Sequence, residues 1–415
     1  MEAKVLHKKK ALAPKLRFSG VEGSWKNILY GDIYTFYTTN SFSRDNLNYN
    51  TGEVKNIHYG DIHTKFATLF DIKKEEVPFI NPDIDIKNIK NESYCQEGDL
   101  VIADASEDYA DIGKTIELIN LNNENIIAGL HTFLARPNKY EMAKGFAGYL
   151  VQSWNFRKQV MVIAQGTKVL SLSTGRLANV KINIPSLPEQ QKIASFLTAV
   201  DEKIQQLTRK KELLEQYKKG VMQQLFSGKL RFKDENGKAF PKWEEKRVDQ
   251  LFNVTRGNVL AVPRMSKKST DKTPYPVYSS QTKENGLTGY YDEFLFEDSI
   301  TWTTDGANAG EVNFRKGKFY CTNVCGVLLN KKGFSNQCIA QILNSVSRKY
   351  VSYVGNPKLM NNVMAVIKII VPVSVVEQKK IANYLSNIDN KIESINKQLT
   401  QTQTFKKGLL QQMFI

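Results

Sequence analysis

What the sequence lacks narrows the class of protein first. Its 415 residues contain four cysteines, too few for a disulfide framework in a chain of this length. The longest apolar runs, such as VIKIIVP at residues 366–372, fall far short of the ~18–20 residues of a membrane span. The N-terminus has no apolar signal-peptide core. We therefore expect a soluble cytoplasmic protein without membrane contact.

Residues for metal binding and catalysis are also scarce. The four histidines all lie in the first third of the chain, whereas Cys321 and Cys325 stand four apart in the last third. This pair favours ordinary buried thiols over a zinc site, which stays an alternative. Gly113-Lys114-Thr115 ends like a phosphate-binding loop, but Asp108 occupies the position that needs a glycine. Asp83 and Asp85 are residue types found in nuclease sites, but they stand only two apart. The stretch from His58 to His63 contains residue types of a catalytic triad. We interpret it as a strand and loop.

Positive charge, in contrast, is in excess. Lysine and arginine number 58 against 42 acidic residues, a formal net charge of +16 at pH 7, which suggests a polyanionic partner. More than half of the excess lies in residues 227–376, which carry +9. Residues 71–111 carry −8 instead. We interpret this acidic stretch as a solvated face, with a docking surface for a basic partner as the alternative.

One long segment occurs twice. Residues 189–226 and 377–414 align without a gap at an offset of 188, with 15 identities in 38 positions. Apolar residues in both copies alternate at spacings of three and four, which predicts two amphipathic helices of about 57 Å each at ~1.5 Å per residue. Each apolar stripe needs a partner, and the comparable stripe belongs to the other copy. We therefore expect the helices to form a coiled coil.

A second repeat lies outside the helices. Leu16-Arg17-Phe18 matches Leu230-Arg231-Phe232, and Trp25 matches Trp243. The chain thus resembles a cyclic repeat of two units that is opened at one joint. Such a repeat predicts a pseudo-two-fold relation, neighbouring chain ends and antiparallel helices.

The expected fold class is α+β, with two mixed α/β domains in a pseudo-two-fold arrangement, joined by the two long antiparallel helices. We place the first domain at residues 1–187, the first helix at 188–228, the second domain at 229–376 and the second helix at 377–415. In each domain, strands should lead to a helical stretch, at residues 142–162 and 337–354, and then to a strand that ends at a proline.

These features resemble one known family. Two helical segments with the pattern EQ-K-IA--L---D-KI, each after a strand ending in Pro185 or Pro372, separate two divergent domains. This layout is similar to that of the specificity subunit of type I restriction-modification systems, over essentially the whole chain. The resemblance implies a subunit without an active site. Its two target recognition domains would each read half of a bipartite, asymmetric site in double-stranded DNA, and the helices would act as a ruler between them.

The resemblance also implies partners. The helices would bind two methyltransferase subunits, and restriction subunits would join through this core. No cofactor is expected in this chain itself. S-adenosylmethionine would belong to the methyltransferase, which methylates adenine at N6, while ATP and Mg would belong to the restriction subunits, which translocate and cleave DNA. The implied location is the bacterial cytoplasm, associated with the nucleoid through DNA.

Base reading needs polar side chains on loops that reach base edges. Any one candidate could equally be an exposed turn residue without a DNA contact. The candidates as a set favour DNA binding. Arg256 and Lys168 stand out because nearby glycines allow close backbone approach. The candidates in the first domain are Ser41, Ser43, Arg44, Asn46, His58, Tyr59, Lys168, Ser171, Ser173 and Arg176. Those in the second are Arg256, Asn258, Arg264, Lys267, Lys268, Tyr278, Ser279, Ser280, Gln281, Lys358, Met360 and Asn361.

Two other classes of protein are alternatives. A scaffold or adaptor could use the coiled coil as its whole function, with domains that bind proteins rather than DNA. A self-contained methyltransferase or nuclease would have to modify DNA without partners. Specific DNA binding that weakens steeply with salt separates the recognition subunit from the scaffold.

Overall fold

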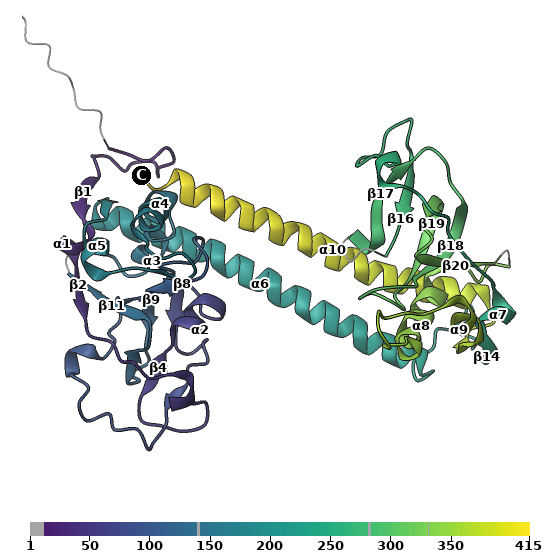
Figure 1. Cartoon of the computed structure of the whole chain (residues 1–415), viewed down its shortest axis with the longest axis horizontal. Coiled ribbons are helices and arrows are strands. Elements are labelled where there is room, and N and C mark those ends of the chain that lie inside the picture. The colour runs from purple at the N-terminus through teal and green to yellow at the C-terminus, as the bar shows by residue number, and fades with distance from the viewer. Residues whose placement is uncertain (1–11, 139–141, 281–283, 331) are drawn as a thin grey trace, which may run out of the picture. The chain divides into compact units, whose positions relative to one another are not determined.

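The computed structural model describes residues 12–138, 142–280, 284–330 and 332–415. They fall into two compact units (Figure 1). Unit 1 comprises Met1–Arg209 and Lys397–Ile415, and unit 2 comprises Lys210–Asn396. Each unit therefore combines one sheet-rich domain with the start of one long helix and the end of the other. Within the described residues, no helix is both long and apolar enough to cross a membrane.

The two long helices are α6, Leu187–Phe226, and α10, Val375–Gln412. In unit 1, Leu409 and Met413 near the end of α10 pack into the same core as Ile193 near the start of α6. In unit 2, Leu225 near the end of α6 shares a core with Ile381 near the start of α10. The helices thus run antiparallel in both units, as predicted, and bury their apolar stripes against each other and the adjoining domain.

An ion pair that occurs once in each unit connects the helices. Lys406 lies 2.7 Å from Asp201 in unit 1, and Lys218 lies 2.6 Å from Asp389 in unit 2. These residues are the same repeat positions with the helices exchanged, because both offsets are 188. The sequence repeat is therefore also a repeat of contacts.

Unit 1 contains a five-stranded sheet in the order β2-β11-β7-β9-β5, and unit 2 contains a six-stranded sheet in the order β15-β20-β18-β19-β16-β17. The first four strands of both sheets are antiparallel, and the next pair is parallel. The first sheet is built from Tyr34–Tyr37, Thr132–Pro137, Leu100–Ala103, Thr115–Asn120 and Leu69–Asp71. The second is built from Asn253–Arg256, Cys325–Leu329, Phe296–Thr303, Val312–Cys321, Tyr275–Tyr278 and Leu287–Tyr291. The two domains therefore share one plan.

The shorter elements repeat as well. A strand before each domain pairs with the strand before each long helix: β1 with β13 in unit 1 and β14 with β21 in unit 2. These strands are Lys26–Leu29, Lys181–Ile184, Glu244–Arg247 and Lys368–Val371. One-turn helices follow β1 and β14: α1, Tyr30–Ile33, and α7, Val248–Leu251. Unit 1 also contains a small four-stranded sheet, β10-β4-β6-β3, from Ile126–Ala128, Lys55–Ile57, Phe79–Ile80 and Leu47–Asn48.

Three local predictions were wrong. Residues 142–162 are not one helix but α3, Phe146–Leu150, and α4, Trp154–Ile163; the Ser153 side chain caps α4 by accepting from the Phe156 N–H. The stretch 337–354 is helical only as α8, Gln337–Ser347, and a following 3-10 turn, because the chain then enters a hairpin. The segment from His58 is a short helix, α2, Tyr59–Thr64, rather than a strand and loop, because the His58 ring nitrogen caps it.

The predicted equivalence of the two joints is confirmed by backbone contacts. The Leu230 N–H donates to the Gln224 carbonyl at the end of α6, and the Leu16 N–H donates in the same way to Gln412 at the end of α10, both at 3.0 Å. At the Leu230 joint the chain runs on directly from α6. At the Leu16 joint the segment near the N-terminus contacts the end of α10 near the C-terminus. The predicted fold class is confirmed: two mixed α/β domains of one plan, with two long antiparallel helices.

A buried ion pair completes each joint. Arg17 lies 2.8 Å from Glu189, and Arg231 lies 2.9 Å from Glu377. Both carboxylates are almost completely buried in the first turn of their long helix. Each arginine therefore fixes the segment that follows one helix to the start of the other.

Candidate nucleic-acid interface

In unit 1, several candidates gather where β7 ends and β11 begins. The centre is the ring of Tyr59, which lies 4.6 Å from the His58 ring and 5.4 Å from the His131 ring. His63, on the next turn of α2, lies 6.1 Å away. The three histidines of the described residues thus surround one tyrosine, although they are distant in sequence.

Charged groups fix this cluster. Arg44 donates to Asp61 at 2.7 Å and lies 3.2 Å from His58 Nδ1. The same Nδ1 accepts from the Gly60 N–H, so it carries no proton. Burial lowers the pKa of His58, and the nearby Arg44 charge acts in the same direction. Arg44 remains half exposed beside a buried carboxylate, a geometry that presents part of its guanidinium to solvent.

His131 and Asp104 extend the cluster. His131 has a positive φ of 55°, unusual for a residue with a side chain, and its Nδ1 lies 3.4 Å from Asp104. Burial raises the pKa of Asp104. Residues just after Asp104 form β8, Ala105–Ser106, which pairs with β12, Leu170–Ser171. The loop with Lys168 and Ser171 therefore lies beside the histidine cluster.

Other candidates of unit 1 are occupied by local structure. Ser43 and Asn46 hydrogen-bond each other at the ends of a 3-10 turn, Arg44–Asn46. Ser173 caps α5, Thr174–Ala178, by accepting from the Arg176 N–H. The Arg176 guanidinium donates to the Ile163 carbonyl at 3.4 Å, and Ser41 is exposed. The side chains of Ser43, Asn46 and Ser173 therefore stabilise turns and caps, whereas the exposed Ser41 stays a predicted DNA contact.

In unit 2, a second group gathers at the equivalent end of the sheet. Arg256 at the end of β15 donates to the Asn361 side chain at 3.4 Å, and Asn361 donates to the Thr255 carbonyl at 3.3 Å. Asn361 begins α9, Asn361–Val366, and Met360 before it is exposed. Lys358 lies 3.8 Å from Asp305. Arg256 and Asn361, separated by about a hundred residues, thus form one polar surface.

Gly257 explains how the loop after Arg256 approaches this surface. A Cβ at Gly257 would lie 1.9 Å from the Cys321 carbonyl oxygen, so only glycine fits. The Asn258 N–H donates to that same oxygen at 3.0 Å. The glycine beside Arg256 therefore allows close backbone approach, as expected, and the group approached is the protein's own backbone at Cys321.

Tyr278 ends β16 and pairs with Cys321 at the end of β19, and Ser279 follows it. The buried Arg315 guanidinium covers the Tyr278 ring at 3.8 Å and donates to Thr301 and to the Asn285 carbonyl. Ser279 accepts from Thr322 at 2.9 Å, and Ser280 follows it. Gln281 lies outside the described residues. No sequence pattern singles out Arg315, because its role depends on the pairing of strands.

Three basic candidates lie elsewhere. Arg264 donates to the Tyr291 hydroxyl and covers that ring at 5.2 Å, and the exposed Lys267 and Lys268 follow it. They adjoin β17, whereas Arg256 is on β15, at the opposite edge of the sheet. The structure therefore separates them from the Arg256 group.

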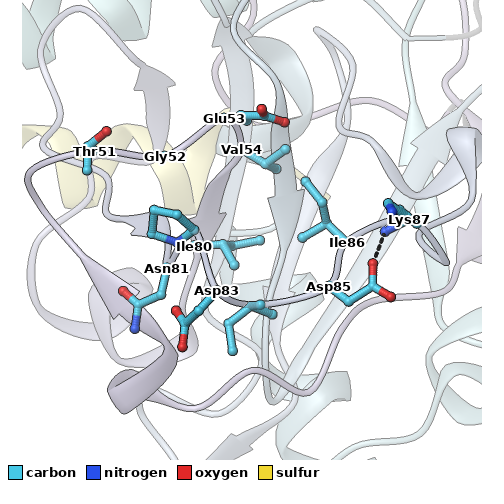
Figure 2. Close-up of a pocket in the computed structure, with 12 residues that line it drawn as sticks. Thr51, Gly52, Glu53, Val54, Ile80, Asn81, Asp83, Asp85, Ile86 and Lys87 are labelled. Atoms are coloured by element: carbon cyan, nitrogen blue, oxygen red, sulfur yellow. Dashed lines mark hydrogen bonds between the residues drawn. The ribbon is translucent and has the colours of Figure 1, made fainter.

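Unit 1 also contains an acidic pocket of about 640 Å³ (Figure 2). Its walls include Glu53, Asp83 and Asp85, together with Ile84 and Ile86. Asp85 accepts from the backbone N–H of Lys87. With Lys87 as the one basic residue of the lining, the carboxylates leave the pocket net negative, which disfavours phosphate groups.

The residues that the structure describes contain no candidate metal site. No three His, Cys, Asp or Glu side chains gather there in a way that could hold a metal ion. All four cysteines are buried and free. The hydrogen bond between Cys321 and Cys325, together with burial, raises the pKa of Cys321, and burial raises that of Cys338. Lys114, the residue of the phosphate-loop-like motif, donates to the His63 carbonyl at 2.7 Å.

Comparison with known proteins gives the fold and site a family. A family model described as the type I restriction modification DNA specificity domain matches residues 25–216 and 241–403. The chain therefore belongs to the type I DNA specificity family. Both copies of the domain and most of both long helices lie within the match.

Individual relatives are similar to this chain as well. A type I specificity subunit of Mycoplasma pneumoniae is 37% identical over 128 residues, which are 30% of this chain and 66% of the relative. The MjaX specificity subunit of Methanocaldococcus jannaschii is 26% identical over 349 residues, 78% of this chain and 80% of the relative. The crystal structure of the type I restriction-modification S subunit from M. genitalium aligns with 97% of this chain and 99% of its own chain, with a TM-score of 0.64. At 16% sequence identity this similarity shows a shared fold.

Proposed function

We propose that this chain is the DNA-reading subunit of a type I restriction-modification complex, with no active site of its own. In both units the same end of the sheet gathers polar and basic side chains from loops far apart in sequence. That observation carries the proposal, because base edges are read by such side chains held on a rigid frame. Because the side chains differ between units, the two half-sites differ as well. The recognition domains are those proposed at residues 1–187 and 229–376.

We also propose how partners bind. Large apolar side chains at equivalent repeat positions stay exposed on the long helices: Tyr217 on α6 and Phe405 on α10. Single exposed apolar side chains are common on protein surfaces, but their repetition at equivalent positions suits two copies of one methyltransferase. S-adenosylmethionine would bind to that methyltransferase, and ATP and Mg to restriction subunits that join through it. Work on DNA would place the complex in the bacterial cytoplasm, at the nucleoid.

Mapping of methylated adenines tests the reading function. The experiment compares the genomic DNA of a host that carries this chain with its methyltransferase against a host that lacks only this chain. We expect one asymmetric motif of two half-sites with a fixed gap, present in the first host alone. A motif that persists without the chain contradicts the proposal.

In vitro binding separates this function from a scaffold. Purified chain with its methyltransferase should bind a duplex that contains the motif, with an affinity that falls by about 10³–10⁵ between 50 and 200 mM salt if six to ten phosphates are neutralised. A scaffold would bind the methyltransferase equally well but would not distinguish the motif from a scrambled duplex.

Serine substitution at the repeated aromatic positions tests the docking surface. Tyr217→Ser with Phe405→Ser should abolish copurification of the methyltransferase. The thermal unfolding of the chain should change little, since both side chains are about half exposed and the one internal bond lost is that between the Tyr217 and Tyr384 hydroxyls. Lys219→Ser with Lys407→Ser, the other repeated and exposed positions two residues further on, is the matched control. Equal loss in both variants would contradict a specific aromatic contact.

A further inference from the structure

Each unit contains a hairpin at the same place in its fold. In unit 1, Gln165 and Ser171 exchange two backbone hydrogen bonds of 3.0 and 2.7 Å; in unit 2, Ser352 and Lys358 exchange two of 2.9 Å. Five residues lie between the paired residues in both hairpins. Their offset of 187 in both cases makes them structural equivalents, although their tips share no sequence.

Both hairpins are anchored to the reading end of the sheet. The Leu172 N–H, after the first hairpin, donates to the Asp104 carbonyl at 2.8 Å, and the Leu359 N–H, after the second, donates to the Thr304 carbonyl at 2.9 Å. The second hairpin has a further bond, from the Gly306 N–H to the Pro357 carbonyl at 3.0 Å. A short helix follows each hairpin, α5 or α9. The tips are therefore held rigidly beside the polar groups described above.

The tips differ in chemistry. The first contains Lys168 beside Val169, which is 54% exposed, whereas the second exposes the adjacent Tyr353 and Val354, which are 70% and 92% exposed. Exposed apolar side chains next to each other usually mark a contact surface. Here they extend the surface formed by Lys358, Arg256 and Asn361, whose cations suit phosphate groups.

We propose that the two hairpins are equivalent reading elements, and that Tyr353 and Val354 in the second pack against the 5-methyl group of a thymine in the major groove. The inference rests on the proposed function. A two-stranded ribbon fits the major groove, and the thymine methyl is the apolar group among the base-edge features there. A polar or phosphate contact would not require an apolar tip.

The test pairs a change in the protein with a change in the DNA. The affinity of the full chain with its methyltransferase is measured for the mapped motif and for duplexes in which each thymine of the second half-site is replaced by deoxyuridine, which lacks only the methyl group. One such replacement should weaken wild-type binding about four-fold, the equivalent of one buried methyl group. Val354→Ala should weaken binding to the thymine duplex by a similar factor and no longer distinguish thymine from deoxyuridine.

Two controls make the result specific. Val162→Ala changes another highly exposed valine, on α4, 83% exposed, and should bind like the wild type. Thymines of the first half-site should respond equally in the wild type and in Val354→Ala. Thermal unfolding shows that both variants fold.

The outcomes separate this inference from the proposed function. If the chain binds its motif but Val354→Ala and Tyr353→Ala keep the full preference for thymine over deoxyuridine, the reading by the hairpin is overturned and the recognition subunit stands. The same holds if these variants bind DNA normally but lose the methyltransferase, which would make the tip a protein contact. If no duplex is preferred at all, the proposed function itself fails.

Discussion

At the residue scale, the most informative buried group is Glu117, which accepts from the Gly145 and Gly148 N–H groups before and in α3. Burial raises the pKa of Glu117 to about 7, although the donated hydrogen bonds act in the opposite direction. The folded state therefore binds this proton more tightly than the unfolded state, in which the pKa is near its ordinary value of 4.5.

It follows that the stability due to this group is complete below about pH 4.5 and is lost as the pH rises through about 7. The loss should be about 3 kcal/mol in the free energy of unfolding. Chemical denaturation at pH 5 and pH 8 measures it in the wild type and in Glu117→Gln, which cannot ionise. The wild type should lose more stability than the variant over this interval; equal losses would show that Glu117 does not titrate there.

The joint ion pairs give a second prediction at this scale. Arg231→Ala would leave the Glu377 carboxylate buried without its partner, which costs about 3–5 kcal/mol. Urea unfolding, followed by tryptophan fluorescence, should show this loss, and Arg231→Ala with Glu377→Gln should recover part of it. Lys246→Ala, which breaks the exposed pair with Glu244, is the control and should cost less than about 1 kcal/mol.

At the element scale, the long helices were predictable because their repeat and apolar spacing are local features of the sequence. The loops were not. The contact of Arg256 with Asn361, or of Tyr59 with His131, requires strands to pair across about seventy to a hundred residues, which no spacing records. The helical stretch after residue 347 was misjudged for a related reason: the anchoring of the hairpin 352–358 to Gly306 outweighs local helix preference.

An insertion in each long helix tests the ruler. Four residues added after Arg209 in α6 and after Lys397 in α10, equivalent positions, lengthen each helix by about 6 Å, or one turn. We expect a longer gap between the half-sites, by about two base pairs of 3.4 Å, with both half-sites unchanged. Mapping of methylated adenines measures the gap. An unchanged gap would mean that the helices do not set it.

At the scale of the whole molecule, the charge is unequal. Because residues 227–376 carry +9 of the net +16, we expect the second domain to depend more on phosphate contacts. Arg256→Ala with Lys358→Ala, both at the reading end of the sheet, should lower the slope of log affinity against log salt by nearly two, about 0.9 for each phosphate that is no longer neutralised. Lys168→Ala with Arg176→Ala in the first domain should lower it less. Binding titrations from 50 to 200 mM salt compare the two; a greater change in the first domain would contradict this assignment.

The composition of unit 1 has a consequence for synthesis of the chain. Its core includes Leu409, Met413 and Phe414, whereas unit 2 is one continuous segment. On the ribosome, unit 2 can therefore complete its core first, while the first domain, made earlier, waits for the last residues of α10. Until then the apolar face of the first half of α6 is covered by the first domain but not by α10, so the domain that is translated first is the one that finishes folding last.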